Sequence, residues 1–222
     1  MTVKLGWYGF PLGHKDAVLP FTPEPLDINI PAPIIQDWAS RTFVIRAPFD
    51  IHIKCEASAD HFNLEWLDPS FELSPVDVFI ITKRDDWSAP DRPTIQWKLN
   101  NLFVADEPVI GETSAPVFHS NHQDWPGVYV PGRLDIHRWT RPFQWVFEWH
   151  DFTKPLKINR GDPILYFRVH TPNFDRDFSL QPLEYTREVE QAIHRCSTIF
   201  PYKKNALGMM DKAVSRRKKW LS

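Results

Sequence analysis

The sequence predicts a mainly β fold, a jelly-roll-like β-sandwich with a C-terminal α-helical appendage. At least eight short segments alternate between apolar and polar residues with a period of two, which is the side-chain period of a half-buried strand. The chain has 21 prolines and only 8 glycines, and the prolines fall between these segments, where they interrupt backbone pairing. From about residue 183 the apolar spacing changes to that of an amphipathic helix.

Composition limits the kinds of protein that this chain can be. Its 222 residues are 42% hydrophobic, enough for one domain with a sizeable core, and the net charge of −2 gives no global attraction to nucleic acid. The N-terminus has no apolar signal-peptide segment, and no stretch approaches the ~18 apolar residues of a membrane span. Cys55 and Cys196 are expected to be buried free thiols. We therefore expect a cytoplasmic protein without membrane contact. A homodimer through a sheet edge or an apolar face is compatible with this composition.

Three segments follow one another along the chain. Residues 1–41 are expected to form an extended, proline-rich lead packed on the domain, because six prolines fall between residues 11 and 33. Residues 42–182 form the predicted β-sandwich. Residues 183–222 form the predicted C-terminal helices and a basic tail.

Alternation marks the strands of the sandwich. Between Phe49 and Cys55 the odd positions are apolar and the even positions are polar. We expect further strands at residues 62–66, 76–81, 95–99, 143–149 and 164–169. In the fourth of these, an aromatic stripe runs along one side, made of Phe143, Trp145, Phe147 and Trp149. Such a stripe is typical of a core face, and the alternative is an exposed platform for sugars or bases.

The C-terminal segment has helical spacing. Its apolar face is formed by Val189, Ala192, Ile193, Cys196 and Phe200. Thr186 is the candidate N-cap and Pro201 ends the helix. A second short helix is expected within residues 207–220. The basic run 216–219 either is a frayed tail or contacts an anionic surface, and only here do we expect any nucleic-acid binding.

The first candidate site is a metal centre. His122 and Asp124 have the His-x-Asp spacing, which puts both side chains on one side of a strand end. Two histidines and one carboxylate suit a divalent transition metal and leave open positions for iron chemistry. The third ligand that we expect is His170, at the end of the strand 164–169.

This order of ligands resembles the jelly-roll iron and 2-oxoglutarate oxygenases, where His-x-Asp comes first and a distal histidine follows. The resemblance implies Fe(II) and 2-oxoglutarate, with the metal held by His122, Asp124 and His170. Those enzymes also carry a basic residue at a set distance after the distal histidine. Here Arg176 comes too early and Arg187 too late, which puts the cosubstrate clamp in doubt.

Two alternatives to this metal centre remain open. In one, the segment is a polar surface loop whose His119 and Asp124 make turn hydrogen bonds. In the other, a cupin-like metal site draws on different residues, namely His137, His150 and His170.

The second candidate site is rich in arginine and tryptophan. We expect residues 133–139 to form a strand that carries Arg, Asp, His and Trp on one face, too polar for a plain core. Guanidinium groups beside an indole bind carboxylate or phosphate through paired hydrogen bonds and stacking. The alternative is an internal ion pair between Asp135 and Arg133. The residues predicted to bind a ligand are Arg133, Asp135, His137, Arg138 and Trp139.

A further resemblance rests on two short pieces, residues 141–145 (Arg-Pro-Phe-Gln-Trp) and 157–167, which contain an Arg-Gly-Asp-Pro turn. They resemble a family of functionally uncharacterised β-rich proteins of phages and bacteria, in which a Trp-rich strand precedes a Gly-Asp-Pro turn and an apolar strand. Over residues 42–170 the match is in the order of strands and turns, and only the two short pieces match in sequence. It implies the fold and carries over no catalytic residue.

Two functions compete. The first is a metal-dependent, non-haem iron oxygenase acting on a small molecule, with an acidic cosubstrate anchored by one of Arg133, Arg138 and Arg168. The second is a non-enzymatic binding or accessory protein, which uses the Arg/Trp-rich face for an anionic ligand or a protein partner. Phosphate loops, dinucleotide glycine fingerprints and Gly-x-Ser-x-Gly elbows are missing from the sequence.

Overall fold

The computed structural model describes residues 2–11, 18–57, 62–68, 73–172, 176–199 and 219–221. These residues form a mainly β structure with four sheets, which we name after one strand of each. The β1 sheet has the order β15 (Phe178–Pro182), β1 (Val3–Gly9), β8 (Asn101–Ala105). The β12 sheet has the order β10 (Gly127–Tyr129), β12 (Gln144–Trp149), β7 (Thr94–Lys98), β6 (Phe79–Ile81). The β14 sheet has the order β11 (Gly132–Asp135), β9 (Ile110–Ser114), β14 (Pro163–His170), β3 (Thr42–Arg46), β2 (Glu24–Pro25). The β4 sheet has the order β13 (Leu156–Ile158), β4 (Ile51–Ala57), β5 (Phe62–Trp66).

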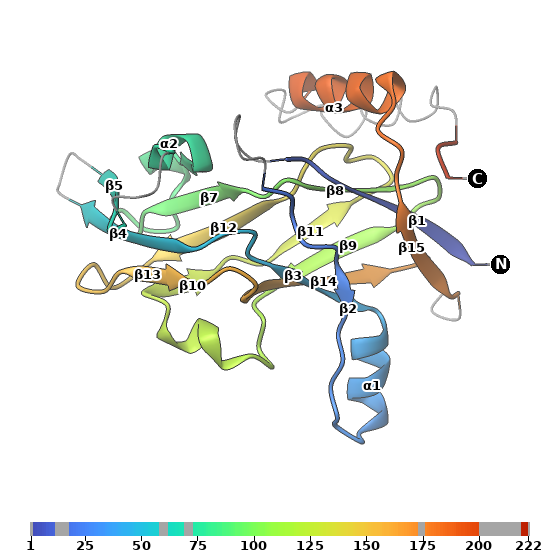
Figure 1. Cartoon of the computed structure of the whole chain (residues 1–222), viewed down its shortest axis with the longest axis horizontal. Helices are drawn as coiled ribbons and strands as arrows, with labels where there is room; N and C mark the ends of the chain where they lie inside the picture. Colours follow the sequence, from blue (N-terminus) through green and yellow to red (C-terminus); the bar gives the residue numbers. More distant parts are fainter. Residues whose placement is uncertain are drawn as a thin grey trace.

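Short helices lie around these sheets. They are α1 (Pro33–Ser40), α2 (Pro75–Val78), α3 (Arg187–Ile199) and two 3₁₀ turns, η1 (Arg84–Asp86) and η2 (Ser120–Asp124). Figure 1 shows α3 along one side of the β1 sheet, with α1 projecting from the opposite side of the molecule. Every described strand pair is antiparallel except β1 with β15, which joins the beginning of the chain to residues near its end. Among the described residues, no helix is long and apolar enough to cross a membrane.

The central core lies between the sheets and is dominated by aromatic side chains. The stripe on β12 belongs to it, because Trp145, Phe147 and Trp149 are fully buried and Phe143 nearly so. Trp145 stacks on Phe147 with a centroid distance of 5.0 Å. The prediction of a core face is therefore confirmed, and this stripe presents no platform to a ligand. Both cysteines are free and buried, as expected, and burial raises the pKa of the Cys55 thiol to about 12.

The helix α3 covers the second face of the β1 sheet. Val189 packs there with Leu102 and Val104 in a separate apolar cluster. Thr186 Oγ1 accepts a hydrogen bond from the Val189 backbone N–H at 3.3 Å, as an N-cap does. The predictions for Phe200, Pro201, the second helix and most of the basic tail concern residues outside those described.

Two local predictions are wrong. Residues 33–40 were expected to be extended, yet they form α1, because Pro33 stands at the first helical position, where its missing N–H costs no hydrogen bond. The expected strand 76–81 begins as α2 and becomes strand only at Phe79. There Ser74 and Asp77 form a reciprocal capping box, which starts a helix within an apolar, β-branched segment.

Candidate functional site

The candidate site lies on the face of the β14 sheet that points away from the central core. Phe167 and Val169 of β14 point into the core, so their neighbours Arg168 and His170 point outward. In register, Glu112 of β9 stands between Arg133 of β11 and Arg168 of β14. Three adjacent strands therefore carry a row of three charged side chains. We call Arg133, Glu112, Arg168 and His170 the charged face.

His170 lies beside this row, two residues beyond Arg168. Its Nε2 atom is 3.0 Å from Glu112 Oε2, and the side chains are 21% and 44% exposed. Burial lowers the pKa of His170, Arg168 and Arg133 lower it further, and Glu112 acts in the opposite direction. The imidazole therefore stays neutral to a lower pH than a free histidine does.

The helix α1 forms a wall beside the charged face. The Arg168 guanidinium carbon lies 5.8 Å from the centre of the Trp38 indole, a cation–π distance. Trp38 in turn contacts the rings of Phe118 and Tyr166, both at 5.7 Å. The Arg168 Nε atom is buried and has no hydrogen-bond partner among the described residues. One donor of this guanidinium is thus held in place without an acceptor.

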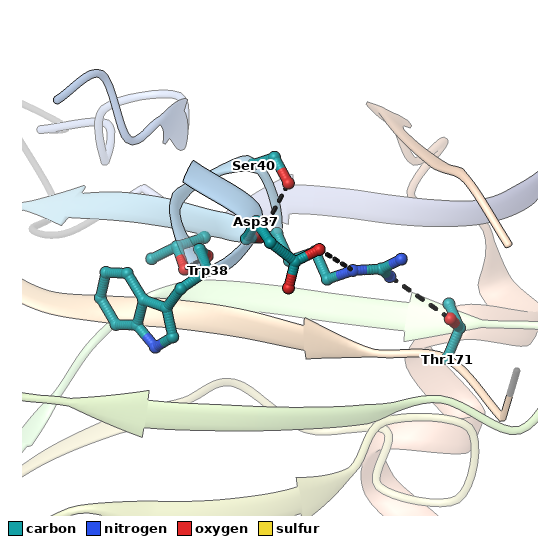
Figure 2. A network of polar contacts seen from close by, with 6 residues as sticks. Asp37, Trp38, Ser40 and Thr171 are labelled. Atoms are coloured by element: carbon teal, nitrogen blue, oxygen red, sulfur yellow. Dashed lines mark hydrogen bonds and ion pairs between the residues drawn. The ribbon is translucent and has the colours of Figure 1, made fainter. Parts of the chain in front are cut away.

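The end of α1 is fixed to the sheet by a small polar network, shown in Figure 2. Thr42 Oγ1, at the start of β3, donates to the carbonyl of Trp38 at 2.7 Å. Arg41 Nη1 donates to Thr171 Oγ1 at 3.5 Å, just after β14, and Arg41 Nε lies 3.9 Å from Asp37 Oδ1. These contacts join α1, β3 and the end of β14, so they set the position of Trp38 relative to Arg168.

The predicted Arg/Trp strand is shorter than expected. The strand β11 ends at Asp135, and residues 136–138 form a turn, so the expectation of one strand face through Trp139 is wrong. Asp135 Oδ1 accepts the backbone N–H of Arg138 at 3.3 Å, and Asp135 Oδ2 is 3.3 Å from the Arg138 guanidinium. His137 Nδ1 is 3.1 Å from the carbonyl of Ala105. Of the five residues predicted to bind a ligand, only Arg133 and Asp135 lie on β11, and both are on its outward side.

Trp139 lies at another place. The Arg141 guanidinium carbon lies 5.2 Å from the centre of its ring. Both residues line a cavity of about 160 Å³, together with Tyr129 and Phe143. This volume is below the ~300 Å³ at which small-molecule pockets begin.

The structure does not bring the predicted metal ligands together. His122 and Asp124 lie in η2, where His122 Nδ1 is 2.5 Å from the carbonyl of His119. His119 Nδ1 is 2.7 Å from the hydroxyl of Tyr166, four residues before His170 on the same strand, which is roughly 13 Å of extended chain. Among the described residues, which include all the predicted ligands, no three His, Cys, Asp or Glu side chains form a group that could hold a metal. The cupin-like set of His137, His150 and His170 is no exception.

A buried carboxylate on β12 is not predicted by the sequence pattern. Glu148 of β12 is 8% exposed, and its Oε1 atom lies 2.7 Å from His150 Nε2 and 3.8 Å from Arg92 Nη1. Its other oxygen accepts a hydrogen bond from Ser88. Burial acts to raise the pKa of Glu148, but these hydrogen bonds and Arg92 lower it overall. Ser88 bonds to the carboxylate rather than to the imidazole, so the three do not form a nucleophile–histidine–acid relay. Alternation along β12 placed Glu148 outward, and there it contacts Ser88 and Arg92 of the segment between β6 and β7.

A groove of about 630 Å³ lies at the C-terminal end of α1 and the start of β3, within the size range of ligand pockets. Its walls include Trp7, Phe43, Phe178 and Leu180. Arg176 at its rim pairs with Glu107 at 2.7 and 3.4 Å, which lowers the pKa of that carboxyl.

Compared with known proteins, the chain matches no protein-family model, and no curated protein is significantly similar to it in sequence. The site is therefore interpreted from its own residues.

Proposed function

We propose that this chain is a binding protein for a small oxyanion, a carboxylate or a phosphate, which it holds on the charged face. The observation that supports this most is the register row in which Arg133 and Arg168 flank Glu112. Planar guanidinium groups bind such anions through paired, charge-assisted hydrogen bonds. The Arg168 guanidinium, whose buried Nε has no acceptor among the described residues, is proposed to hold the ligand through its remaining donors.

The charge balance of the face favours an anion. Arg133 and Arg168 stand against one carboxylate, Glu112, while Asp135 is paired with Arg138. The face is therefore net positive with His170 neutral, and more so once His170 is protonated. The half-exposed row is open to solvent, and Trp38 limits it on one side.

Binding is favoured over the iron oxygenase because that activity needs His122, Asp124 and His170 at one metal. In this proposal His170 acts instead as a third donor beside the two arginines. The sandwich is proposed to be jelly-roll-like with a helical appendage. Its non-consecutive strand neighbours support this, since β14 lies between β9 and β3, and β12 between β10 and β7.

The test is a titration at constant ionic strength with two probes, inorganic phosphate and 2-oxoglutarate. Binding is measured by calorimetry and by the NMR chemical shifts of the β9 and β14 amides. Arg168→Gln and Arg133→Gln are each expected to weaken binding at least about tenfold, the ~1.4 kcal/mol of one charged hydrogen bond. Glu112→Gln is expected to strengthen it, because a competing carboxylate is removed. Arg187→Gln, at the exposed start of α3, is the matched control and should leave affinity within twofold.

The two probes separate the two ligand classes. Saturation by phosphate alone identifies a phosphate site, and saturation by 2-oxoglutarate alone identifies a carboxylate site. If neither probe shifts the amides of β9 and β14, or if Arg187→Gln weakens binding as much as Arg168→Gln does, the proposal fails.

A further inference from the structure

The groove of about 630 Å³ is bordered by two strands that end their sheets. On one side lies β15, which pairs only with β1 among the described strands, and on the other lie β2 and the residues before it, which pair only with β3. The lining residues on the two sides include Leu180 and Pro182 on β15, and Pro23 and Pro25 at β2.

The backbone groups of the two borders differ. In the β1 sheet, Val3 donates to the carbonyl of Asp177 and Leu183 donates to that of Trp7, so the odd residues of this segment bond to β1. By the alternation of a strand, the N–H and C=O groups of Phe178 and Leu180 then point to the unpaired side. This border presents two donors and several acceptors at strand spacing.

The opposite border presents no such donors. Leu26 donates to the carbonyl of Thr42, and Glu24 stands opposite Val44, so the even residues of this segment bond to β3. The positions that face away from β3 are 23 and 25, and both are proline. Proline has no N–H, which is a common means of preventing unwanted pairing at a sheet edge. One border of the groove is thus protected and the other is not.

The groove beside the unprotected border is apolar. The side chains of Phe178 and Leu180 lie on the same face of the sheet as Val3 and Leu5, which belong to the central core. Phe178 also contacts Phe43 across the groove, with ring centroids 5.8 Å apart. A strand added beside β15 would place every second side chain over these residues and extend the core.

We propose that the groove binds an extended peptide segment of a partner protein, which adds to β15 as a new strand and places alternate apolar side chains against Phe43, Phe178 and Leu180. Only an extended backbone matches donors and acceptors at strand spacing, and the flanking groove supplies the specificity. Because β2 borders the groove opposite β15, a second folded copy would bring its own sheet against β2, whereas a single extended segment would not. None of the four residues of the charged face lines this groove.

The test begins with a phage-displayed library of random 12-residue peptides, selected on the full chain and counter-selected on the Leu180→Pro variant. Proline at residue 180 removes one outward N–H and leaves the bonds of β15 to β1 in place, and Pro182 already occupies the next outward position. Leu180→Ala is the matched control, because it loses a similar side chain and keeps the N–H. Circular dichroism and thermal unfolding check that both variants are folded.

The selected peptides are expected to alternate apolar and polar residues. Leu180→Pro should weaken the binding of a synthetic selected peptide at least about thirtyfold, and Leu180→Ala should weaken it less than fivefold. N-methylation of the peptide at successive residues, tested on the unmodified protein, should abolish binding at every second position only. This scan keeps the test valid if Leu180→Pro does not fold.

Three outcomes would overturn the proposal. One is that no peptide is enriched, and another is that affinity in the N-methyl scan varies without a period of two. The third is that the chain is a dimer at micromolar concentration that Leu180→Pro makes monomeric, because a second copy would then occupy the edge.

Discussion

The indole N–H of Trp145 on β12 donates a hydrogen bond to the carbonyl of Ile164 on β14, with an N–O distance of 2.9 Å, and joins two sheets through the core. Ile164 stands where the pairing of β14 with β3 shifts register, so its carbonyl lies outside that ladder. A buried carbonyl without a partner costs free energy, and here a side chain from the opposite sheet supplies the partner.

Trp145→Phe is expected to lower the free energy of unfolding by about 1–3 kcal/mol more than Trp97→Phe does. Trp97 is the register partner of Trp145 and is equally buried, but its indole N–H has no acceptor among the described residues. The two variants lose the same atoms and differ in one hydrogen bond. Urea unfolding curves measure the difference, and equal losses would show that the contact to Ile164 contributes nothing.

Thr42→Val is expected to destabilise the protein by about 1–2 kcal/mol, because the Trp38 carbonyl at the end of α1 loses the donor that the buried Thr42 supplies. Ser40→Ala is the control, since the Ser40 hydroxyl makes a comparable bond to the Asp37 carbonyl at an exposed position and should cost under ~0.5 kcal/mol. Thermal unfolding measures both. The prediction fails if the two variants have the same melting temperature.

Gly127→Ala is expected to be far more damaging than Gly161→Ala. A Cβ at Gly127 would lie 2.0 Å from the backbone carbonyl oxygen of Glu148, so β10 and β12 would have to separate. Gly161 has a φ of +86° and open space around it, so alanine there meets backbone strain of only about 1 kcal/mol. The denaturation midpoints of the two variants test this prediction, and a lower midpoint for Gly161→Ala than for Gly127→Ala would contradict it.

Stability is expected to fall as the pH is lowered from 7 to 5.5, in part through His170. Burial lowers the pKa of His170 in the folded chain, so the unfolded chain takes up its proton first as the pH falls through the ordinary value of 6.5. Carboxyls with lowered pKa, such as Glu148, act at lower pH. His170→Gln should flatten the slope of unfolding free energy against pH. His194→Gln, at an exposed position on α3, is the control for removing a histidine, and a slope that His170→Gln does not flatten relative to this control would contradict the linkage.

The sequence was most informative where local pattern and tertiary burial coincide. The aromatic stripe on β12 was placed correctly because every second residue faces the same core. Residues 133–139 alternate in the same way, but the Asp135 carboxylate accepts the Arg138 N–H and ends the strand in a turn. Both patterns are of period two. In the second, the backbone N–H groups of Arg138 and Trp139 bond to the Asp135 carbonyl, and the Asp135 carboxylate adds a competing side-chain hydrogen bond.

In the part of the chain that the structure describes, the predicted metal ligands do not form one group, because tertiary distance decides this. His-x-Asp spacing fixes two side chains locally, but the separation between His122 and His170 depends on how η2 folds against β14, which no spacing encodes. The charged face was found only in part for the same reason. Arg133, Arg168 and His170 were all singled out from the sequence, but Glu112 and Trp38 join them only through strand register and the placement of α1.

The parallel pairing of β1 with β15 determines when the fold can be completed. Val3 stands opposite Phe178, so β1 gains its second neighbour only after the chain has been synthesised beyond residue 178. Until then β1 can pair with β8 alone and keeps one side open to wrong partners. Synthesis therefore leaves one side of β1 unpaired until β15 has been made, and a chain that stops before residue 178 keeps that side exposed.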